Sequence, residues 1–237
     1  MESAPERVYN GGVAGQAKDG KERWRPMTGK TGRSTKGKIV AAAWRLFYEQ
    51  GFEQTTVEEI IAASGTSKGS FYHYFEGKDA LLGTLSMLFD EKYEALQHEI
   101  GPDRGAAEAL LRLNRELFAM IENSVPLELL ARLLSSQLLM RGQRQLLDRN
   151  RTYFRLLHRL VRRGQETGEL RGDVPAGEIV SAYAMFERAL MYDWCLAGGS
   201  YGLGEYASRM MPMMLEAYKT KKEQSAVQSS VQEPYSL

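Results

Sequence analysis

Residues 37–82 read GKIVAAAWRLFYEQGFEQTTVEEIIAASGTSKGSFYHYFEGKDALL, and this stretch decides the fold that the sequence predicts. From about Lys38 to Gln50, apolar residues recur at spacings of three and four, which indicates an amphipathic helix. Gly51 is expected to end this helix, because glycine adopts the left-handed conformation of a helix C-cap at no steric cost. The stretch therefore begins with a short helix that has a clear stop signal.

A second and a third short helix follow, joined by a turn that contains glycine. Thr56 and Glu59 have the spacing of a capping box, which marks the start of the second helix. Residues 64–66, Ser-Gly-Thr, are expected to end it, and the third helix is expected over residues 67–75. Two helices joined by such a turn form the helix-turn-helix geometry, in which the second helix of the pair enters the major groove of DNA.

The outward side of the third helix carries residues whose chemistry suits DNA. Lys68 can neutralise a phosphate or bind a guanine, and Ser70 can hydrogen-bond to a base edge. Gly69 costs about 1 kcal/mol within a helix, but without a side chain it lets the backbone approach the duplex closely. Tyrosine hydroxyls can reach phosphate oxygens, and the start of the next helix has free amides that favour a phosphate. This reasoning gives seven expected DNA-binding residues, which are Lys68, Gly69, Ser70, Tyr72, His73, Tyr74 and Lys78.

At these residues the chain resembles the tetracycline-repressor (TetR) family of bacterial transcriptional regulators. The pattern comprises Gly51-Phe52, TTVEEI at 55–60, ASG at 63–65, SKGSFYHYF at 67–75 and KDALL at 78–82. The resemblance implies that Ser70 and its neighbours face base edges, and that the phosphate backbone is touched by Thr56, Tyr72, Tyr74 and Lys78. It also implies a homodimer, an all-helical ligand-binding domain, and repression that a small molecule relieves.

Charge is unevenly distributed along a chain that is nearly neutral as a whole, since its 237 residues carry a formal net charge of +1. Residues 1–36 hold eight basic and four acidic side chains and are rich in glycine and polar residues, which predicts a disordered basic arm. Residues 37–78 hold four basic and five acidic side chains, so the arm could supply phosphate attraction along a groove. The competing interpretation is a leader that does not contact DNA.

Two absences in the sequence bear on the compartment. The first 36 residues lack the continuous apolar stretch of a signal peptide, and no run of eighteen apolar residues predicts a transmembrane helix. The single cysteine, Cys195, excludes an intrachain disulfide and fits a reducing environment. We therefore expect a cytoplasmic protein without a membrane partner.

Beyond residue 78 every segment is expected to be helical. Glycine, proline and polar clusters separate the segments, and no alternating pattern typical of strands stands out. The expected helices are 78–98, 105–123, 127–140, 143–166, 176–196 and 203–220. With the three earlier helices, this predicts an all-α protein of about nine helices. The expected domains are a helix-turn-helix DNA-binding domain at 37–83 and a helical ligand-binding and dimerisation domain at 84–220, followed by a polar tail at 221–237.

The last two expected helices carry wide apolar faces that could hold two copies of the chain together. One face would comprise Ile179, Tyr183, Phe186, Leu190 and Trp194, and the other Tyr206, Met210, Met213 and Ala217. Paired with their copies they would form a four-helix bundle, which would set two recognition helices about 34–36 Å apart. Intramolecular core is the alternative, and the family resemblance favours the homodimer.

A small-molecule site is expected among helices 78–166 and the helix at 176–196. Its apolar walls would comprise Leu117, Phe118, Leu138, Phe154 and Tyr183, with His158 or Glu187 as the orienting polar group. Such walls suggest an apolar or aromatic effector. Its binding is expected to tilt helix 78–98, which would be continuous with the DNA-binding segment, and so to change the spacing of the recognition helices.

Other functional classes find little support in the sequence. Residues 65–69 spell the text of a nucleophile elbow, but that motif needs a strand before its serine, and a capped helix precedes it here. No catalytic residue, cofactor or metal site is expected, since the histidines His73, His98 and His158 lie far apart without ligand spacing. Two classes remain, a DNA-binding, ligand-responsive repressor and a helical binding or scaffold protein that does not bind DNA.

Overall fold

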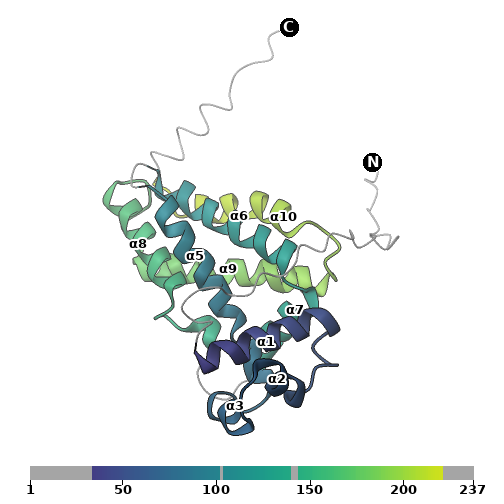
Figure 1. Ribbon diagram of the computed structural model, residues 1–237. Coiled ribbons are helices and arrows are strands. Elements are labelled where there is room, and N and C mark those ends of the chain that lie inside the picture. Colours follow the sequence, from purple (N-terminus) through teal and green to yellow (C-terminus); the bar gives the residue numbers. More distant parts are fainter. Residues whose placement is uncertain (1–33, 102–103, 140–143, 221–237) are drawn as a thin grey trace, which may run out of the picture.

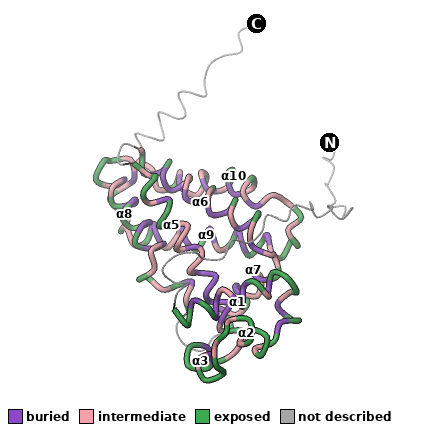
Figure 2. The backbone as a smooth tube through the Cα atoms, viewed as in Figure 1, coloured by how far each residue is buried: buried purple, intermediate pink, exposed green. Residues whose placement is uncertain are grey.

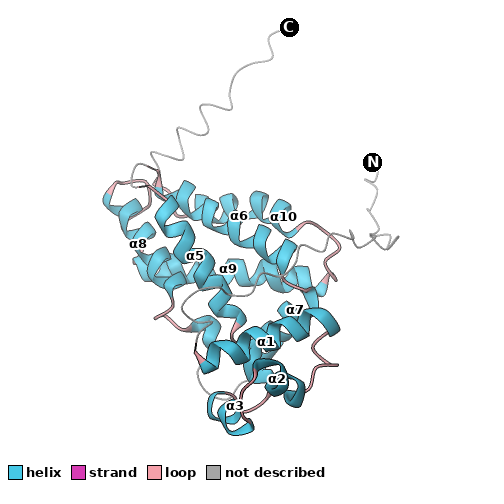
Figure 3. Ribbon diagram, in the orientation of Figure 1, coloured by secondary structure: helices cyan, strands magenta, loops and turns pink. Residues whose placement is uncertain are grey.

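The computed structural model describes residues 34–101, 104–139 and 144–220, and their regular structure is helical (Figure 3). Apart from one isolated antiparallel bridge between Leu170 and Lys219, these residues form no β-structure. The all-α fold is therefore confirmed, whereas the polar tail and most of the basic arm lie outside these ranges. The helices are α1 Thr35–Gln50, α2 Val57–Ser64, α3 Lys68–Tyr74, α4 Lys78–Leu82, α5 Leu85–Glu99, α6 Ala106–Ser124, α7 Leu127–Leu139, the 3-10 helix η2 Gln145–Leu147, α8 Thr152–Glu166, α9 Ala176–Leu196 and α10 Leu203–Glu216.

Helices α1 to α3 form a small bundle at one end of the molecule (Figure 1). Its core is apolar, because Ile39, Phe47, Ile60 and Phe71 are each at most 2% exposed. Helices shorter than about 12–15 residues are marginal on their own in water, so this shared core stabilises α2 and α3. The bundle thereby presents α3 on a fixed support.

Side-chain caps and a glycine determine where these helices begin and end. The expected capping box is present: the Thr56 hydroxyl accepts the Glu59 amide at 3.2 Å, and the Glu59 carboxylate accepts the Thr56 amide at 2.8 Å. Ser34 and Ser67 cap α1 and α3 with their hydroxyls. Gly65 ends α2 in the left-handed conformation, with φ of 63°. These local signals set the helix-turn-helix geometry.

The helix expected over residues 78–98 is divided, which corrects the prediction of one continuous helix. A turn at residues 83–84 separates α4 from α5. The Thr84 hydroxyl donates to the Leu81 carbonyl at 2.6 Å and accepts the Trp44 indole N–H at 2.7 Å. Hydroxyls that bond to the backbone compete with the helical hydrogen-bond ladder. The bundle of α1 to α3 is therefore attached to α5 through a turn.

Only part of the segment expected as a helix over residues 143–166 is α-helical. Residues 145–147 form η2, and α8 begins at residue 152. Asp148 accepts the amide of Asn150 at 2.9 Å, which closes an Asx turn and keeps this stretch out of the helix. Leu146 consequently reaches the interior from the short 3-10 helix η2 rather than from an α-helical face, and it is 8% exposed.

Helices α5 to α10 form the larger part of the molecule, with α6 packed on both α8 and α10. Figure 2 shows that their buried residues lie on the inner faces of the layers. Where α8 meets α6, Gly164 leaves no room for a side chain: a Cβ there would lie 2.8 Å from the Ala106 Cβ and from Leu170. None of the helices within the described ranges is long and apolar enough to cross a membrane.

The apolar face expected on the helix at 176–196 is mostly internal. Ile179, Tyr183, Leu190 and Trp194 are each at most 6% exposed, so these four residues belong to the core of their own chain. Side chains at the surface of α9 instead form an apolar seam with the three- and four-residue spacing of a helix interface, comprising Ala182, Met185, Ala189, Tyr192 and Leu196. On α10 the expected face does reach the surface, and Met213 is 68% exposed.

The bundle of α1 to α3 meets the larger part at a joint of charged and aromatic side chains. Phe52 lies between two cations, with the Lys78 Nζ 4.5 Å and the Arg132 guanidinium 4.9 Å from its ring centre. Arg132, on α7, also pairs with Glu128 at 2.9 Å and with Glu53. These cation–π and ion-pair contacts hold the loop between α1 and α2 against α7.

Candidate nucleic-acid interface and internal cavity

α3 lies at the tip of the molecule with one side inward and the other open (Figures 1 and 2). Phe71 is 0% and Phe75 5% exposed, whereas Tyr72 and Tyr74 are 47% and 42% exposed. The four-residue spacing of the phenylalanines explains their shared inward direction. Large aromatic side chains that remain open to water often mark a contact surface.

The outward residues expected to bind DNA extend over this open side. Lys68 Nζ lies 6.0 Å from the centre of the Tyr72 ring, and the rings of His73 and Tyr74 meet edge to face at 4.7 Å. These contacts hold the rings beside one another without burying them. Hydroxyls, an imidazole and an ammonium group are thereby displayed together along one short helix.

The first turn of α3 is open to a close partner. The Ser67 hydroxyl accepts the Ser70 amide at 3.0 Å, and the two hydroxyl oxygens lie 2.9 Å apart. A Cβ added at Gly69 would have no neighbour nearer than that hydroxyl of Ser67, at 3.9 Å. Packing within the chain therefore does not require glycine at this position, although glycine weakens a helix by about 1 kcal/mol.

Thr56 and Lys78, which the resemblance assigns to phosphate contacts, already have partners in the chain. Thr56 caps α2, and the hydrogen bond from its backbone amide lowers the pKa of Glu59. Lys78 Nζ donates to the Phe52 carbonyl at 2.7 Å and lies over the Phe52 ring. An ammonium group has three donors, so Lys78 retains some capacity for a phosphate while it supports the joint.

Lys36 is a candidate that the sequence reasoning assigned to the arm. It is exposed in the first turn of α1, and its Nζ lies 5.9 Å from the ring centre of Phe75 at the end of α3. The signal that would have found it is the Ser-Thr pair at 34–35, which starts α1 three residues earlier than expected. Lys36 places one more cation beside the recognition helix. Contact between the rest of the arm and DNA stays a prediction.

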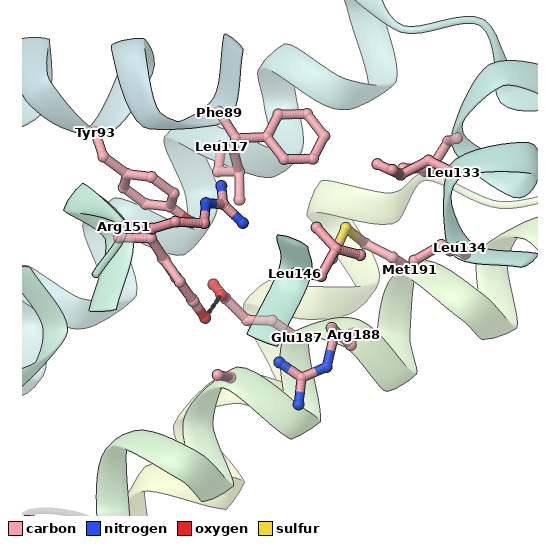
Figure 4. Close-up of a pocket in the computed structure, with 13 residues that line it drawn as sticks. Phe89, Tyr93, Leu117, Leu133, Leu134, Leu146, Arg151, Glu187, Arg188 and Met191 are labelled. Carbon is pink, nitrogen blue, oxygen red and sulfur yellow. Dashed lines mark hydrogen bonds between the residues drawn. The ribbon is translucent and has the colours of Figure 1, made fainter. Parts of the chain in front are cut away.

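A small cavity lies between α5, α6, α7, α8, α9 and η2 (Figure 4). Its volume of about 30 Å³ would hold about two water molecules, so a larger ligand must move the walls apart. The apolar lining residues are Phe89, Leu117, Leu130, Leu133, Leu134, Leu146, Ala184 and Met191. The polar lining residues are Tyr93, Arg151, Tyr153, Glu187 and Arg188.

Of the residues expected to form the pocket, Leu117 and Glu187 line this cavity. Three others are buried in the core without lining it, namely Phe118, Phe154 and Tyr183. Leu138 is 67% exposed and His158 is exposed, so neither belongs to the cavity. On a helix each residue is rotated by about 100° from the last, so an error of one position moves a side chain from the core to the solvent.

Sequence reasoning missed Tyr93, Tyr153 and Arg151. The first shares a helical face with Phe89, four residues earlier, and this spacing was the available signal. Arg151 is held by Asp90, with Nε and Oδ2 2.8 Å apart, and donates to the Ser86 carbonyl at 2.8 Å. That arginine precedes α8 rather than lying within it, so helical spacing gave no indication of its position.

Glu187 is the buried carboxyl group of the cavity, at 2% exposed. Its Oε2 accepts the Tyr153 hydroxyl at 2.6 Å, and its Oε1 accepts the Asn114 amide at 2.8 Å. Burial raises the pKa of Glu187, because a poorly polarisable interior disfavours the ionised form. Within the described ranges, no three potential metal ligands gather closely enough to hold an ion.

Known proteins are similar to this chain in the DNA-binding bundle and over most of its length. Residues 39–85 match the family described as bacterial regulatory proteins, tetR family. The uncharacterized regulator YerO of Bacillus subtilis (strain 168) is 47% identical over 20% of this chain, but over only 16% of its own length. The transcriptional repressor KstR2 of Rhodococcus jostii (strain RHA1) is 26% identical over 80% of this chain and 92% of its own.

The fold is also found in a solved regulator. FadR of Thermus thermophilus, a TetR-family transcriptional repressor in complex with lauroyl-CoA, superposes with a TM-score of 0.58 at 24% identity. The match covers 78% of this chain and 95% of that one, and at such identity it concerns the fold.

The capped helix-turn-helix, the open side of α3 and these matches define a DNA-binding regulator of transcription. Within that class, the similarity is to the TetR family of bacterial regulatory proteins, over residues 39–85 in the family model and over most of the chain in KstR2.

Proposed function

We propose that the protein represses transcription by binding a DNA operator as a homodimer, and that it leaves the operator when a small molecule enters the cavity. The observation that carries the proposal is the open side of α3, where Lys68, Ser70 and the exposed tyrosines project from a buried apolar support. In this arrangement Ser70 contacts a base edge, and Lys68, Tyr72 and Tyr74 contact phosphates. The protein acts in the bacterial cytoplasm, where the chromosome lies.

The homodimer forms through the surface seam of α9 together with the outer side of α10. Met185, Tyr192 and Leu196 are 63%, 44% and 72% exposed, and they lie on one side of α9 at helix-interface spacing. Exposed apolar side chains in such a row favour association with a matching surface. A two-fold axis through this seam directs both recognition helices to one face of DNA.

A symmetric operator is the direct test of this arrangement. Protection of the upstream DNA of its own gene from nuclease cleavage should reveal two half-sites of inverted sequence, with centres about one helical turn apart. A single protected half-site would contradict the homodimer, and no protected sequence would contradict operator binding.

We propose that a ligand in the cavity releases the protein from DNA by moving the turn between α4 and α5. Leu146 lines the cavity, and the preceding residue, Gln145, lies so close to Gly83 that a Cβ there would collide with its amide group. Arg151, also at the cavity, donates to the Ser86 carbonyl in the first turn of α5. A ligand that displaces η2 or Arg151 therefore moves the turn that supports the DNA-binding bundle. The ligand weakens DNA binding only by its preference for the displaced state.

A further inference from the structure

One polar group in the cavity has no partner. Tyr93 is 2% exposed, and its hydroxyl forms no hydrogen bond among the described residues. Unpaired buried hydroxyls are rare, because leaving one unsatisfied costs about 1–3 kcal/mol. Burial raises the pKa of Tyr93 well above its ordinary value, so the hydroxyl is neutral and can both donate and accept. The position of Tyr93 thus invites a partner that the chain itself does not supply.

Two further groups complete a polar end of the cavity beside Tyr93. The rings of Tyr93 and Tyr153 have centres 5.0 Å apart, and the Tyr153 hydroxyl donates to Glu187 Oε2. A carboxylate oxygen can accept a second hydrogen bond, so Oε2 remains available to a donor. Figure 4 shows Tyr93 and Glu187 on the same side of the cavity, with Leu133, Leu134 and Met191 toward its other end.

The cations near this end do not favour an anionic ligand. Arg151 is satisfied by Asp90 and by the Ser86 carbonyl. Arg188 leaves α9 on the side away from Tyr93 (Figure 4). An anionic head group beside Tyr93 would therefore lie near the Glu187 carboxyl group, and Arg151, which also lines the cavity, is already paired with Asp90. An anion buried in a poorly polarisable interior without a paired cation is costly, which disfavours such a ligand.

We propose that the effector is a neutral apolar molecule that carries a hydroxyl group, and that this hydroxyl binds between Tyr93 and Glu187. The ligand hydroxyl accepts from Tyr93 and donates to Glu187 Oε2, so both polar groups gain a partner. Its apolar body displaces the leucines and Met191 at the other end of the cavity. The inference rests on the proposed ligand-responsive function, and it specifies the chemical class of the ligand.

Calorimetric titration of the full chain with three probes of one shape tests the inference. The probes are para-ethylphenol, para-ethyltoluene and the para-ethylbenzoate anion, which present a hydroxyl, a methyl and a carboxylate at the same place. The phenol should bind at least about tenfold more tightly than the other two, because only the phenol satisfies both groups. Equal affinity of the phenol and the toluene, tighter binding of the benzoate, or no binding of the phenol overturns the inference.

Two variants identify the group responsible. Tyr93→Phe should lower the affinity for the phenol about tenfold, to the level of the toluene, and should leave the affinity for the toluene unchanged. Tyr218→Phe is the control: its tyrosine packs against the core but does not line the cavity, so the preference for the phenol should persist. Loss of the preference in Tyr218→Phe alone would overturn the assignment to Tyr93.

Titration of the same preparation with operator DNA separates this inference from the proposed function. If the protein binds DNA but does not prefer the phenol, the inferred ligand class is wrong and the proposed DNA-binding function stands. A preference for the phenol without any DNA binding retains the inference and removes the proposed function. The Tm of Tyr93→Phe should be no lower than that of the parent protein, because the removed hydroxyl has no partner in the unliganded chain.

Discussion

The first turn of α3 contains Lys68, Gly69 and Ser70. Gly69 weakens the helix, and the ammonium group of Lys68 is open to solvent. No packing contact of the fold requires the glycine. In the proposed function, close approach of the backbone to a duplex would account for it, because a side chain would separate the two surfaces. Lys68 and Ser70 flank this point of approach, so their effects on DNA binding should differ in kind.

Lys68→Ala should weaken binding to the operator and to unrelated duplex DNA by similar factors if Lys68 contacts a phosphate, which carries no sequence information. The slope of log affinity against log salt concentration should fall by about one. Arg159→Ala, which removes an exposed cation from α8, is the control and should leave the slope unchanged. A loss confined to the operator, seen by fluorescence anisotropy on both duplexes, would instead assign Lys68 to a base.

Glu187 gives the protein a testable pH dependence. Because burial raises its pKa in the folded state above the ordinary value of 4.5, the folded chain keeps a proton that the unfolded chain releases. The stabilising effect of this proton is complete below about pH 4.5 and is lost as the pH rises through the folded-state pKa. Tyr153, Tyr183 and Arg188 contribute to the field at Glu187, and burial is the largest cause.

Glu187→Gln should remove this dependence while keeping the volume of the side chain. The free energy of unfolding of the variant relative to the parent should rise between pH 5 and pH 8, by about 1.4 kcal/mol per pH unit for each proton by which the states differ. Urea unfolding at both pH values measures it. A difference between variant and parent that stays constant with pH would show that burial of Glu187 does not raise its pKa.

At the scale of helices, the sequence predicts most elements but not their interruptions. Caps and glycines locate α1 to α3, since these signals are local. The break between α4 and α5 depends on the Trp44 indole, which reaches Thr84 from a distant part of the chain. No local pattern in residues 78–98 reports that contact. The position of Leu146 on η2 has a local cause instead, because an Asx turn closed by Asp148 and Asn150 interrupts the expected helix.

The crossing of α6 and α8 depends on the absence of a side chain at Gly164. Gly164→Ala should destabilise the protein by about 1–3 kcal/mol, because its Cβ would overlap the Ala106 Cβ and Leu170. Gly177→Ala is the matched control in α9: a Cβ there meets nothing within 4 Å, and alanine should stabilise the helix by about 0.5–1 kcal/mol. Denaturant unfolding of both variants measures these changes. Equal changes in the free energy of unfolding of the two variants would show that α6 and α8 move apart without an energetic cost.

The whole molecule combines three parts: the open side of α3, the cavity between α5 and α9, and the surface seam of α9. The sequence predicted the first of these well, because its motif is contiguous. The cavity and the seam depend on which sides of long helices face inward. Tyr183 and Trp194 show the difficulty, since their apolar character suits an interface and a core equally, and the structure places both in the core.

Two leucines of similar exposure test the seam. Leu196→Arg on α9 should convert the homodimer to a monomer and weaken operator binding by at least about tenfold, because the operator would then be held by one recognition helix. Leu138→Arg, at 67% exposed on α7, should leave both properties unchanged. Sedimentation analysis gives the molecular mass of each variant. A dimeric Leu196→Arg variant would place the interface elsewhere.

Fluorescence anisotropy of the full chain on its own upstream DNA shows whether α3 binds DNA. The measurement is made at two salt concentrations, beside a Tyr72→Ala variant that removes an exposed side chain from α3 without opening the core. The account predicts tight, salt-sensitive binding by the parent protein and a clear loss of affinity in the variant. Absence of binding even at low salt, or equal binding by parent and variant on all duplexes, would contradict it.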